Sequence, residues 1–298
     1  MKKLMTFICV SMFILAGALY AEGQQTQGGA SAGPARPPAS AFSNDAWATM
    51  DSAFEDKSQT LMDKYYLGRA VAANVLAAYK PYNGNSELTR YLNRICQTLV
   101  INSSQVEIYN GYHVLILDTP EFNAFATPGG HIFLTRGLIN VATSEDMLAA
   151  VIAHELSHIM LDHAMILINS DEMQMSAQMS QAAGQGAALA GNTSAATRLM
   201  SYRNSVAGIV DSMLKNGYSK QFEFEADAGA VTLLAASGYD PASLVEVLRL
   251  LQQVQGSQRG GFNTTHPSPA ERIANVQPVV SRYRVTDTRS YRTPRFKK

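Results

Sequence analysis

The sequence is poor in cysteine and carries no excess of charge of either sign. Of its two cysteines, Cys9 lies inside an N-terminal apolar run, so Cys96 is the one thiol of the remaining chain. A single thiol excludes an internal disulfide, and stability must come from a packed core or from a bound metal. Cys96 lies beside the apolar stripe of a predicted helix, which predicts a buried thiol.

The 24 basic and 24 acidic side chains balance, and the pI is near 7.0. Binding to nucleic acid requires many basic groups that neutralise phosphates, so we expect no nucleic-acid partner. The 298 residues are 46% apolar, which excludes a collagen-like or wholly disordered chain. This length allows one or two globular domains.

A long apolar run occurs at the N-terminus. Lys2 and Lys3 precede apolar residues from Leu4 to Leu19, and small residues continue to Ala21. This layout is typical of a secretory signal peptide at residues 1–21, with an uncleaved membrane anchor as the alternative. Residues 22–44 are rich in Gly, Ala, Pro, Ser and Gln, which predicts a disordered tether. The rest of the chain is therefore expected to be exported.

Residues 45–280 are predicted to form a domain of the α+β class, predominantly helical with a small β-sheet. Two β-rich segments, 112–117 and 132–135, are connected through a turn at residues 127–130. Apolar residues recur at helical spacing in five further segments. The predicted helices span residues 45–79, 87–101, 144–168, 220–237 and 241–253.

Two segments each allow two interpretations. Residues 176–199 are dominated by small and polar residues, which indicates either a pair of small-residue helices or a mobile flap over a cleft. The tail at residues 281–298 holds seven basic groups from Arg282 onward against one acid, Asp287. We expect this tail to be solvated, and attraction to an anionic membrane surface is the alternative.

The segment His154-Glu155-Leu156-Ser157-His158 is the strongest indication of chemistry in the chain. On an α-helix, residues four apart lie about 40° from each other, so both imidazoles project from one face and can bind one metal ion. Glu155 lies beside that face, where it can reach a metal-bound water without itself binding the ion. Apolar residues around the motif bury the rest of this helix, which favours a metal site over an accidental match.

A catalytic zinc site has three protein ligands and one open position, so a third ligand is needed. His163 lies about 100° around the helix from the position that a known motif with a third histidine requires. Glu223 is the better candidate, because a second predicted helix carries it together with Asp227, four residues on. Asp227 can accept the other ring N–H of a ligating histidine and fix its tautomer. Glu225 is predicted to point away into solvent.

Residues 154–158 and 219–227 resemble the corresponding motifs of the zinc metallopeptidases of the HtpX and type-I CAAX prenyl endopeptidase family. The resemblance extends over roughly residues 65–280. HtpX-like and CAAX-processing proteins carry several membrane spans, whereas this chain has none after its predicted signal peptide. It is therefore similar to the soluble periplasmic branch, the BepA- and LoiP-like proteins. The segments that match the family are residues 154–158, 219–227, 123–133 and 266–272.

The resemblance implies a zincin-like (gluzincin) metalloprotease domain whose small sheet edges the active-site cleft, with one Zn²⁺ per chain and a periplasmic location. His154, His158 and Glu223 would bind the zinc. Glu155 would act as the general base and then deliver the proton to the leaving amine. His163 recurs in the pattern of the family and is expected to support packing.

The resemblance also suggests His266 and Arg272 as stabilisers of the oxyanion that forms on the scissile carbonyl. Each has an alternative interpretation. Arg272 could be a surface residue at the start of a helix, which Pro267 and Pro269 mark. His266 could occupy the open zinc position and hold the enzyme latent.

The region from Asn123 to Phe133 is predicted to bind substrate. A strand edge beside two glycines lets an extended peptide add backbone hydrogen bonds, which suits unfolded exported proteins. His113 and His131 are interpreted as strand-surface residues. The predicted substrate-binding residues are Asn123, Ala124, Phe125, Gly129 and Gly130.

The predicted function is that of a zinc endopeptidase acting on unfolded or misassembled envelope proteins. The alternative is a non-enzymatic chaperone or outer-membrane assembly factor that uses the same groove, and an intact Glu155 argues against it. A structural zinc domain is a weaker interpretation, because closed sites usually use four Cys or His ligands. Expected partners are unfolded polypeptides, the outer-membrane assembly machinery and, through the basic tail, an anionic membrane surface.

Overall fold

A computed structural model describes residues 44–104, 108–168, 206–207, 210, 217–254, 268–284 and 286–296. The predicted signal peptide, the predicted tether up to residue 43, the segment 176–199 and His266 lie outside these residues. Residue contacts separate Met1–Ser52 from Ala53–Lys298. The described part of the first unit is the start of helix α2, and the rest of α2 and all other elements below belong to the second unit.

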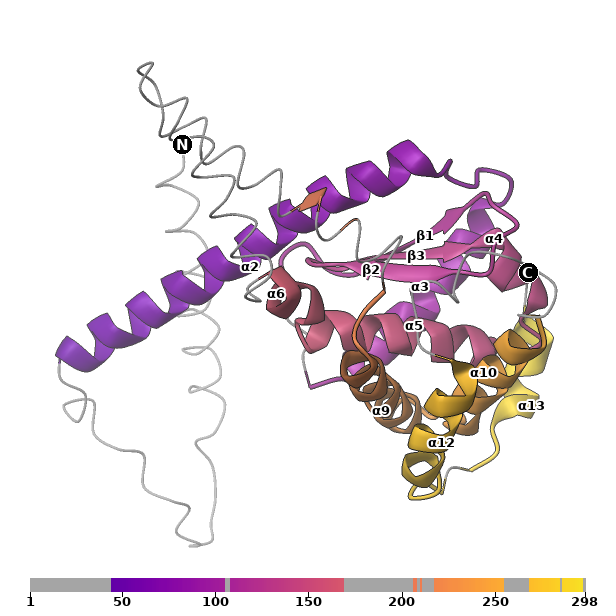
Figure 1. Cartoon of the computed structure of the whole chain (residues 1–298). Helices are drawn as coiled ribbons and strands as arrows, with labels where there is room; N and C mark the ends of the chain where they lie inside the picture. Colours follow the sequence, from indigo (N-terminus) through magenta and orange to yellow (C-terminus); the bar gives the residue numbers. More distant parts are fainter. Residues whose placement is uncertain are drawn as a thin grey trace, which may run out of the picture. The chain divides into compact units, whose positions relative to one another are not determined.

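The described residues are mostly helical with one small sheet, which confirms the predicted balance of elements (Figure 1). All five predicted helices occur, four of them within two residues of the expected ends. The longer helices are α2 (Asn44–Ala78), α3 (Ser86–Ile101), α5 (Glu145–Met160), α9 (Lys220–Ala236), α10 (Ala242–Val254) and α12 (Pro269–Val280). The short ones are α4 (Arg136–Val141), α6 (His163–Ile168), α13 (Arg289–Arg292) and the 3₁₀ helix η3 (Thr293–Arg295).

Side-chain caps fix where several helices begin. Asn85, Ser144, Ser219 and Ser268 each accept hydrogen bonds from backbone N–H groups in the first turn of the following helix. These N–H groups have no partner within a helix, so a capping oxygen at that position stabilises its start. The caps before α5 and α9 matter most for function, because these two helices carry the motif residues.

The helix predicted over residues 144–168 is interrupted. α5 ends at Met160, and Asp162 has a positive φ of 55°, which a continuous right-handed helix does not allow. The Asp162 carboxylate accepts two hydrogen bonds from Lys64 Nζ on α2, at 2.8 and 2.7 Å. A distant ion pair thus holds the break, and the chain resumes as the short helix α6.

The sheet contains β1 (His113–Leu117), β2 (Ala124–Thr127) and β3 (His131–Thr135) in the order β1-β3-β2. β3 pairs in parallel with β1 and antiparallel with β2. The predicted turn does not connect β1 with β3: it joins β3 to β2, a strand that the predicted β-rich segments did not include. Gly129 has a positive φ of 78° in this turn. A Cβ on Gly129 would lie 2.6 Å from Tyr65 Cα, so close packing of this turn on α2 requires glycine.

Alternate residues of the strands face two apolar clusters. Val114, Ile132 and Leu134 join the larger cluster with α3, α5, α9 and α10, whereas Phe125 and Phe133 face a smaller cluster with α2. Figure 1 accordingly shows α2 and α5 on opposite sides of the sheet. α5 is buried along nearly its whole length and is the central helix of the larger cluster.

Cys96 is fully buried in the larger cluster, as predicted. Desolvation raises the pKa of its thiol to about 12, which makes it inert at neutral pH.

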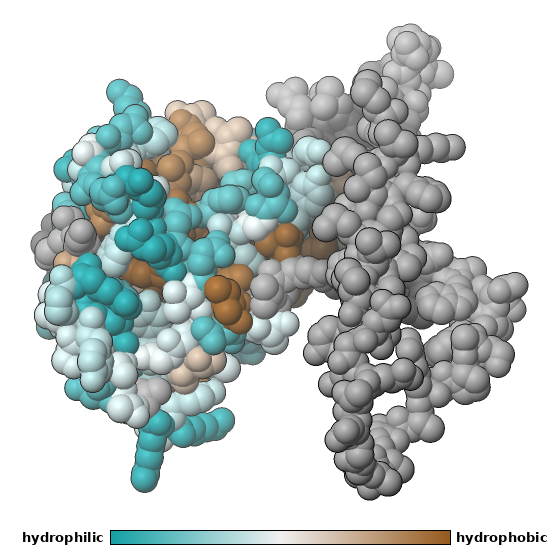
Figure 2. All heavy atoms as spheres, turned by 180° about the vertical axis from the view of Figure 1, so that it is seen from behind, coloured by the Kyte–Doolittle hydropathy of each residue, from teal (hydrophilic) through white to brown (hydrophobic). Residues whose placement is uncertain are grey.

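Apolar patches on the surface lie between hydrophilic side chains (Figure 2). Among the described helices, none combines the length and the apolar character that crossing a membrane requires.

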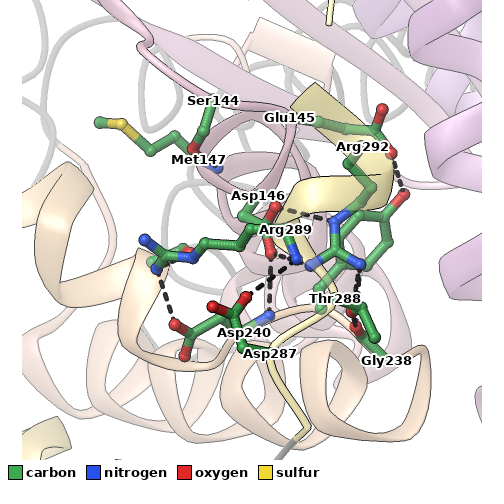
Figure 3. A network of polar contacts seen from close by, with 12 residues as sticks. Ser144, Glu145, Asp146, Met147, Gly238, Asp240, Asp287, Thr288, Arg289 and Arg292 are labelled. Carbon is green, nitrogen blue, oxygen red and sulfur yellow. Dashed lines mark hydrogen bonds and ion pairs between the residues drawn. The ribbon is translucent and has the colours of Figure 1, made fainter. Parts of the chain in front are cut away.

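The basic tail is not wholly solvated, which corrects the prediction for three of its arginines. Arg292 donates to both carboxylate oxygens of Asp146 at 2.8 and 2.6 Å, and Arg295 does the same to Glu145. Arg289 donates to Asp240 at 2.7 Å. Figure 3 shows Arg289 and Arg292 beside Asp146 at the start of α5. The tail therefore belongs to the folded unit and neutralises acids at the N-terminus of the motif helix.

Candidate metal centre

The packing of α5 against α9 brings the two motif segments together. Gly229 on α9 faces Ser157 on α5, and a Cβ at this glycine would lie 2.7 Å from the Ser157 hydroxyl. The small residue permits a close approach of the helices. As a result His154 and His158, one turn apart on α5, face Glu223 in the first turn of α9. All three are buried, with at most 3% of each residue exposed.

The three side chains offer donor atoms at the spacing of a metal site. His154 Nε2 lies 3.1 Å from His158 Nε2 and 3.5 Å from Glu223 Oε2, and His158 Nε2 lies 3.6 Å from Glu223 Oε1. Ligands about 2.1 Å from a tetrahedral zinc ion are about 3.4 Å apart. The observed distances match this value, so the residues fit a zinc ion.

The charges around these donors also favour a cation. Glu155, Glu223 and Asp227 are buried acids, and Arg272 is the buried cation beside them. When all three carboxyl groups are ionised and the imidazoles are neutral, the acids exceed the one guanidinium by two negative charges. A divalent ion balances them, which removes the penalty of burying uncompensated charge.

His154 lies against two of these acids. Its Nδ1 lies 3.0 Å from Asp227 Oδ1, the geometry predicted for a carboxylate that fixes the tautomer of a ligating histidine. Burial and Arg272 disfavour a positive charge on the ring, but Asp227 and Glu223 outweigh both and raise the pKa of His154 to about 9. The site therefore attracts positive charge at this position.

Glu155 is almost completely buried, and its Oε1 makes no hydrogen bond to any described residue. Desolvation, with Glu223 nearby, raises the pKa of this carboxyl to about 7 although His154 and Arg272 oppose the shift. A carboxylate with a pKa near neutrality can both accept and return a proton at physiological pH.

Arg272 lies in the first turn of α12 and is buried, so it is not the surface residue that the alternative interpretation placed there. Its Nε and Nη2 donate to the two oxygens of Asp227 at 2.9 and 2.6 Å. Its Nη1 lies 3.2 Å from Glu223 Oε2. Arg272 thus connects the carboxylate behind His154 with the carboxylate that faces the metal position.

The predicted substrate-binding segment lies beside this centre. Thr127, Pro128 and Gly129 line a pocket that also includes His158. Other residues of the segment serve the fold: Asn123 Oδ1 accepts from the N–H of Ala124, and Phe125 points into the apolar cluster with α2. Gly130, like Gly129, has a positive φ in the turn.

Of three further neighbours of the centre, Tyr218 was missed and Glu225 was misjudged from the sequence, whereas the burial of His163 agrees with the expected packing role. The Tyr218 ring stacks on His158 with centroids 4.5 Å apart. Glu225, predicted to be solvated, is half-exposed and contacts His163 at 3.2 Å. His163 itself is fully buried against His158, where the break after α5 places it. A signal for Tyr218 existed, since an aromatic residue directly precedes the Ser219 cap of α9.

A family model of peptidase family M48 matches residues 86–280, which include every residue of the centre described above. The chain belongs to peptidase family M48. The resemblance to metallopeptidases that the motifs carry is thereby confirmed.

Several relatives of this M48 chain bear the names of proteases, some of them metalloproteases. It is 30% identical over 192 residues to the Beta-barrel assembly-enhancing protease of Escherichia coli (strain K12), covering 64% of this chain and 38% of the relative. It is 29% identical over 165 residues to the Mitochondrial metalloendopeptidase OMA1 of Arabidopsis thaliana, with 54% and 30% covered. Metalloprotease LoiP of E. coli (strain K12) is 28% identical over 198 residues, with 66% and 72% covered. The chain thus matches less than two fifths of the length of the first two relatives.

Proposed function

We propose that this chain is a zinc-dependent endopeptidase. The observation that carries the proposal is the convergence of His154, His158 and Glu223 at zinc-ligand spacing, with Glu155 buried beside them. We further propose that the domain is zincin-like, with the motif helix α5 packed beneath the sheet. The family match and the metalloprotease names of the relatives support both statements.

Glu155 performs the proton transfers of the proposed reaction. It accepts a proton from the attacking water and delivers it to the amine that leaves when the peptide C–N bond breaks, so it is regenerated after each turnover. Zinc, when bound by His154, His158 and Glu223, supplies Lewis acidity that polarises the scissile carbonyl and activates the water. Asp227 holds His154 in the tautomer whose Nε2 is free to bind the metal.

Stabilisation of the oxyanion is assigned to His266, which lies outside the described residues. The alternative role of His266 is that of a fourth zinc ligand that keeps the enzyme latent. A structure with zinc bound would distinguish this role from oxyanion stabilisation. Arg272 binds Asp227 and Glu223, which favours a positioning role over the predicted contact with the oxyanion. Loss of Arg272 is therefore expected to weaken zinc binding as well as turnover.

The proposed substrates are extended or unfolded exported polypeptides, and the proposed location is the periplasm. Among the described strands, β2 pairs with β3 alone and lies at the end of the strand order, which supports the addition of an extended peptide at its other edge. One relative is named for enhancing β-barrel assembly, which suggests misassembled outer-membrane proteins and their assembly machinery as partners. A non-enzymatic chaperone role is disfavoured, because it gives no reason for a buried Glu155 beside a zinc site.

The decisive experiment combines metal analysis with digestion of casein and of an unfolded outer-membrane protein. The purified chain should contain one zinc per molecule and should cleave both substrates, and a chelator should stop cleavage. Glu155→Gln should retain zinc and fold but lose cleavage, since the amide cannot accept the proton. Cleavage that persists in this variant, or a chain that binds no zinc, would overturn the proposal.

A further inference from the structure

The second ring nitrogen of His158 has a partner that the proposed mechanism does not use. His158 Nε2 faces the metal position, and its Nδ1 lies 2.8 Å from Nδ1 of His163. His163 is fully buried, so both of its ring nitrogens need partners within the protein. The other nitrogen, Nε2, lies 3.2 Å from Oε2 of Glu225.

These contacts define one consistent set of protons. A zinc-binding Nε2 carries no hydrogen, so His158 must bear its proton on Nδ1 and donate it to Nδ1 of His163. His163 then bears its own proton on Nε2 and donates it to the Glu225 carboxylate. Gln221 donates to the other oxygen of Glu225 at 2.7 Å and helps to hold it.

Neighbouring aromatic rings fix the planes of both imidazoles. Tyr218 stacks on His158 at an interplanar angle of 19°. Phe222 stacks on His163 with centroids 4.4 Å apart and an angle of 4°. Neither ring of the pair can rotate without losing such a contact, so the hydrogen bond between them has a defined geometry.

The break between α5 and α6 is what makes the pair possible. In a continuous helix, residue 163 would lie about 140° around the axis from residue 158, facing elsewhere. The positive φ of Asp162, held by its ion pair with Lys64, redirects the chain. His163 returns to His158 and begins α6. A turn fixed from α2 thus serves the metal centre.

We propose that His163 and Glu225 form a positioning pair that sets the orientation and tautomer of His158 as a zinc ligand. The proposal rests on the proposed function, because it requires that zinc binds here. It gives each ligand histidine a carboxylate behind it: Asp227 contacts His154 directly, and Glu225 acts on His158 through an imidazole. Removing such partners typically weakens metal binding 10- to 100-fold.

The test measures the zinc dissociation constant by competition with a chromophoric chelator. His163→Phe keeps an aromatic ring against Phe222 but removes both nitrogens, and we expect about 10- to 100-fold weaker zinc binding. His163→Asn places an amide where Nδ1 was and should restore a large part of the affinity. The Glu225 side chain is half-exposed, so we expect Glu225→Ala to leave the fold intact. This substitution should weaken zinc binding less than His163→Phe does, because Glu225 acts on His158 only through His163.

A second measurement distinguishes the proposed positioning role of His163 from a purely structural one. The cobalt(II) form of His163→Phe should show altered visible absorption bands, because these bands report the geometry of the metal ligands. The unfolding free energy of the metal-free variant reports the effect of the substitution on packing alone. Glu87→Ala removes an exposed carboxylate on α3 and is the matched control. Should His163→Phe and Glu225→Ala bind zinc as the parent does, with unchanged cobalt spectra, the positioning role is refuted. A parent chain that binds no zinc refutes the proposed function instead.

Discussion

The two ends of helix α5 bury charge in opposite ways. At its N-terminus, Asp146 and Glu145 each accept two hydrogen bonds from an arginine of the C-terminal segment, so every buried acid has its own cation. Toward its C-terminus, His154, Glu155 and His158 face further acids with Arg272 as the nearby cation. One end is neutralised within the protein, whereas the other is left with a deficit of positive charge that a metal ion can fill.

This contrast separates what holds the helix in place from what the helix does. The arginine contacts anchor α5 at a distance of about 12 Å from the first motif histidine, given eight residues at 1.5 Å each. The proposed metal ion would offset the acidic surplus at the other end. The predictions below test whether the anchor and the metal centre are independent.

The largest expected effect is the loss of the anchor. Arg292→Ala leaves the buried Asp146 carboxylate without its guanidinium, and breaking a buried pair in this way costs about 3–5 kcal/mol of unfolding free energy. Urea unfolding of the metal-free protein measures it. Arg282→Ala removes an exposed arginine of the same segment and should change stability by less than about 0.5 kcal/mol. Equal effects of the two substitutions would show that the ion pair does not anchor the helix.

Zinc binding at the metal centre of α5 should have the next largest effect on the free energy of unfolding. At free zinc 100-fold above its dissociation constant, binding to the folded state adds about 2.7 kcal/mol. If the ends are independent, zinc adds the same increment to Arg292→Ala, because sites more than about 10 Å apart are usually additive. A smaller increment in that variant would show that the anchor also shapes the metal centre.

The sequence predicted the metal end of α5 far better than the anchored end. His154, His158 and Glu223 could be selected because helical periodicity fixes the faces of two helices, and zinc chemistry demands a third donor. The Arg292–Asp146 pair joins residues 146 positions apart, and no local pattern connects them. The break at Asp162 is similarly hidden, since Lys64 stabilises it from 98 residues away. Local rules find the site, whereas long-range ion pairs decide how it is held.

Gly229→Ala should affect both stability and the metal centre. The added Cβ would lie 2.7 Å from the Ser157 hydroxyl, so α9 must shift away from α5. Overpacking of this kind costs about 1–3 kcal/mol, and the shift would move Glu223 away from the two imidazoles. Urea unfolding and chelator competition measure the two effects. Adding Ser157→Ala should relieve part of both, and a substitution that leaves zinc affinity unchanged would show that the helix spacing is not critical.

Arg295→Ala should have the smallest effect on stability. It separates the contribution of Arg295 to the anchoring of α5 from that of Arg292. The Arg295 side chain is 60% exposed, whereas that of Arg292 is 9% exposed, so solvent already screens much of its interaction with Glu145. Tyr91 and Tyr239 still donate to the buried carboxylate after the substitution, at 2.8 and 3.0 Å. We therefore expect a loss of about 1 kcal/mol in urea unfolding, well below that of Arg292→Ala. A loss as large as that of Arg292→Ala would mean that the number of arginine contacts, rather than their burial, determines how strongly the C-terminal segment holds α5.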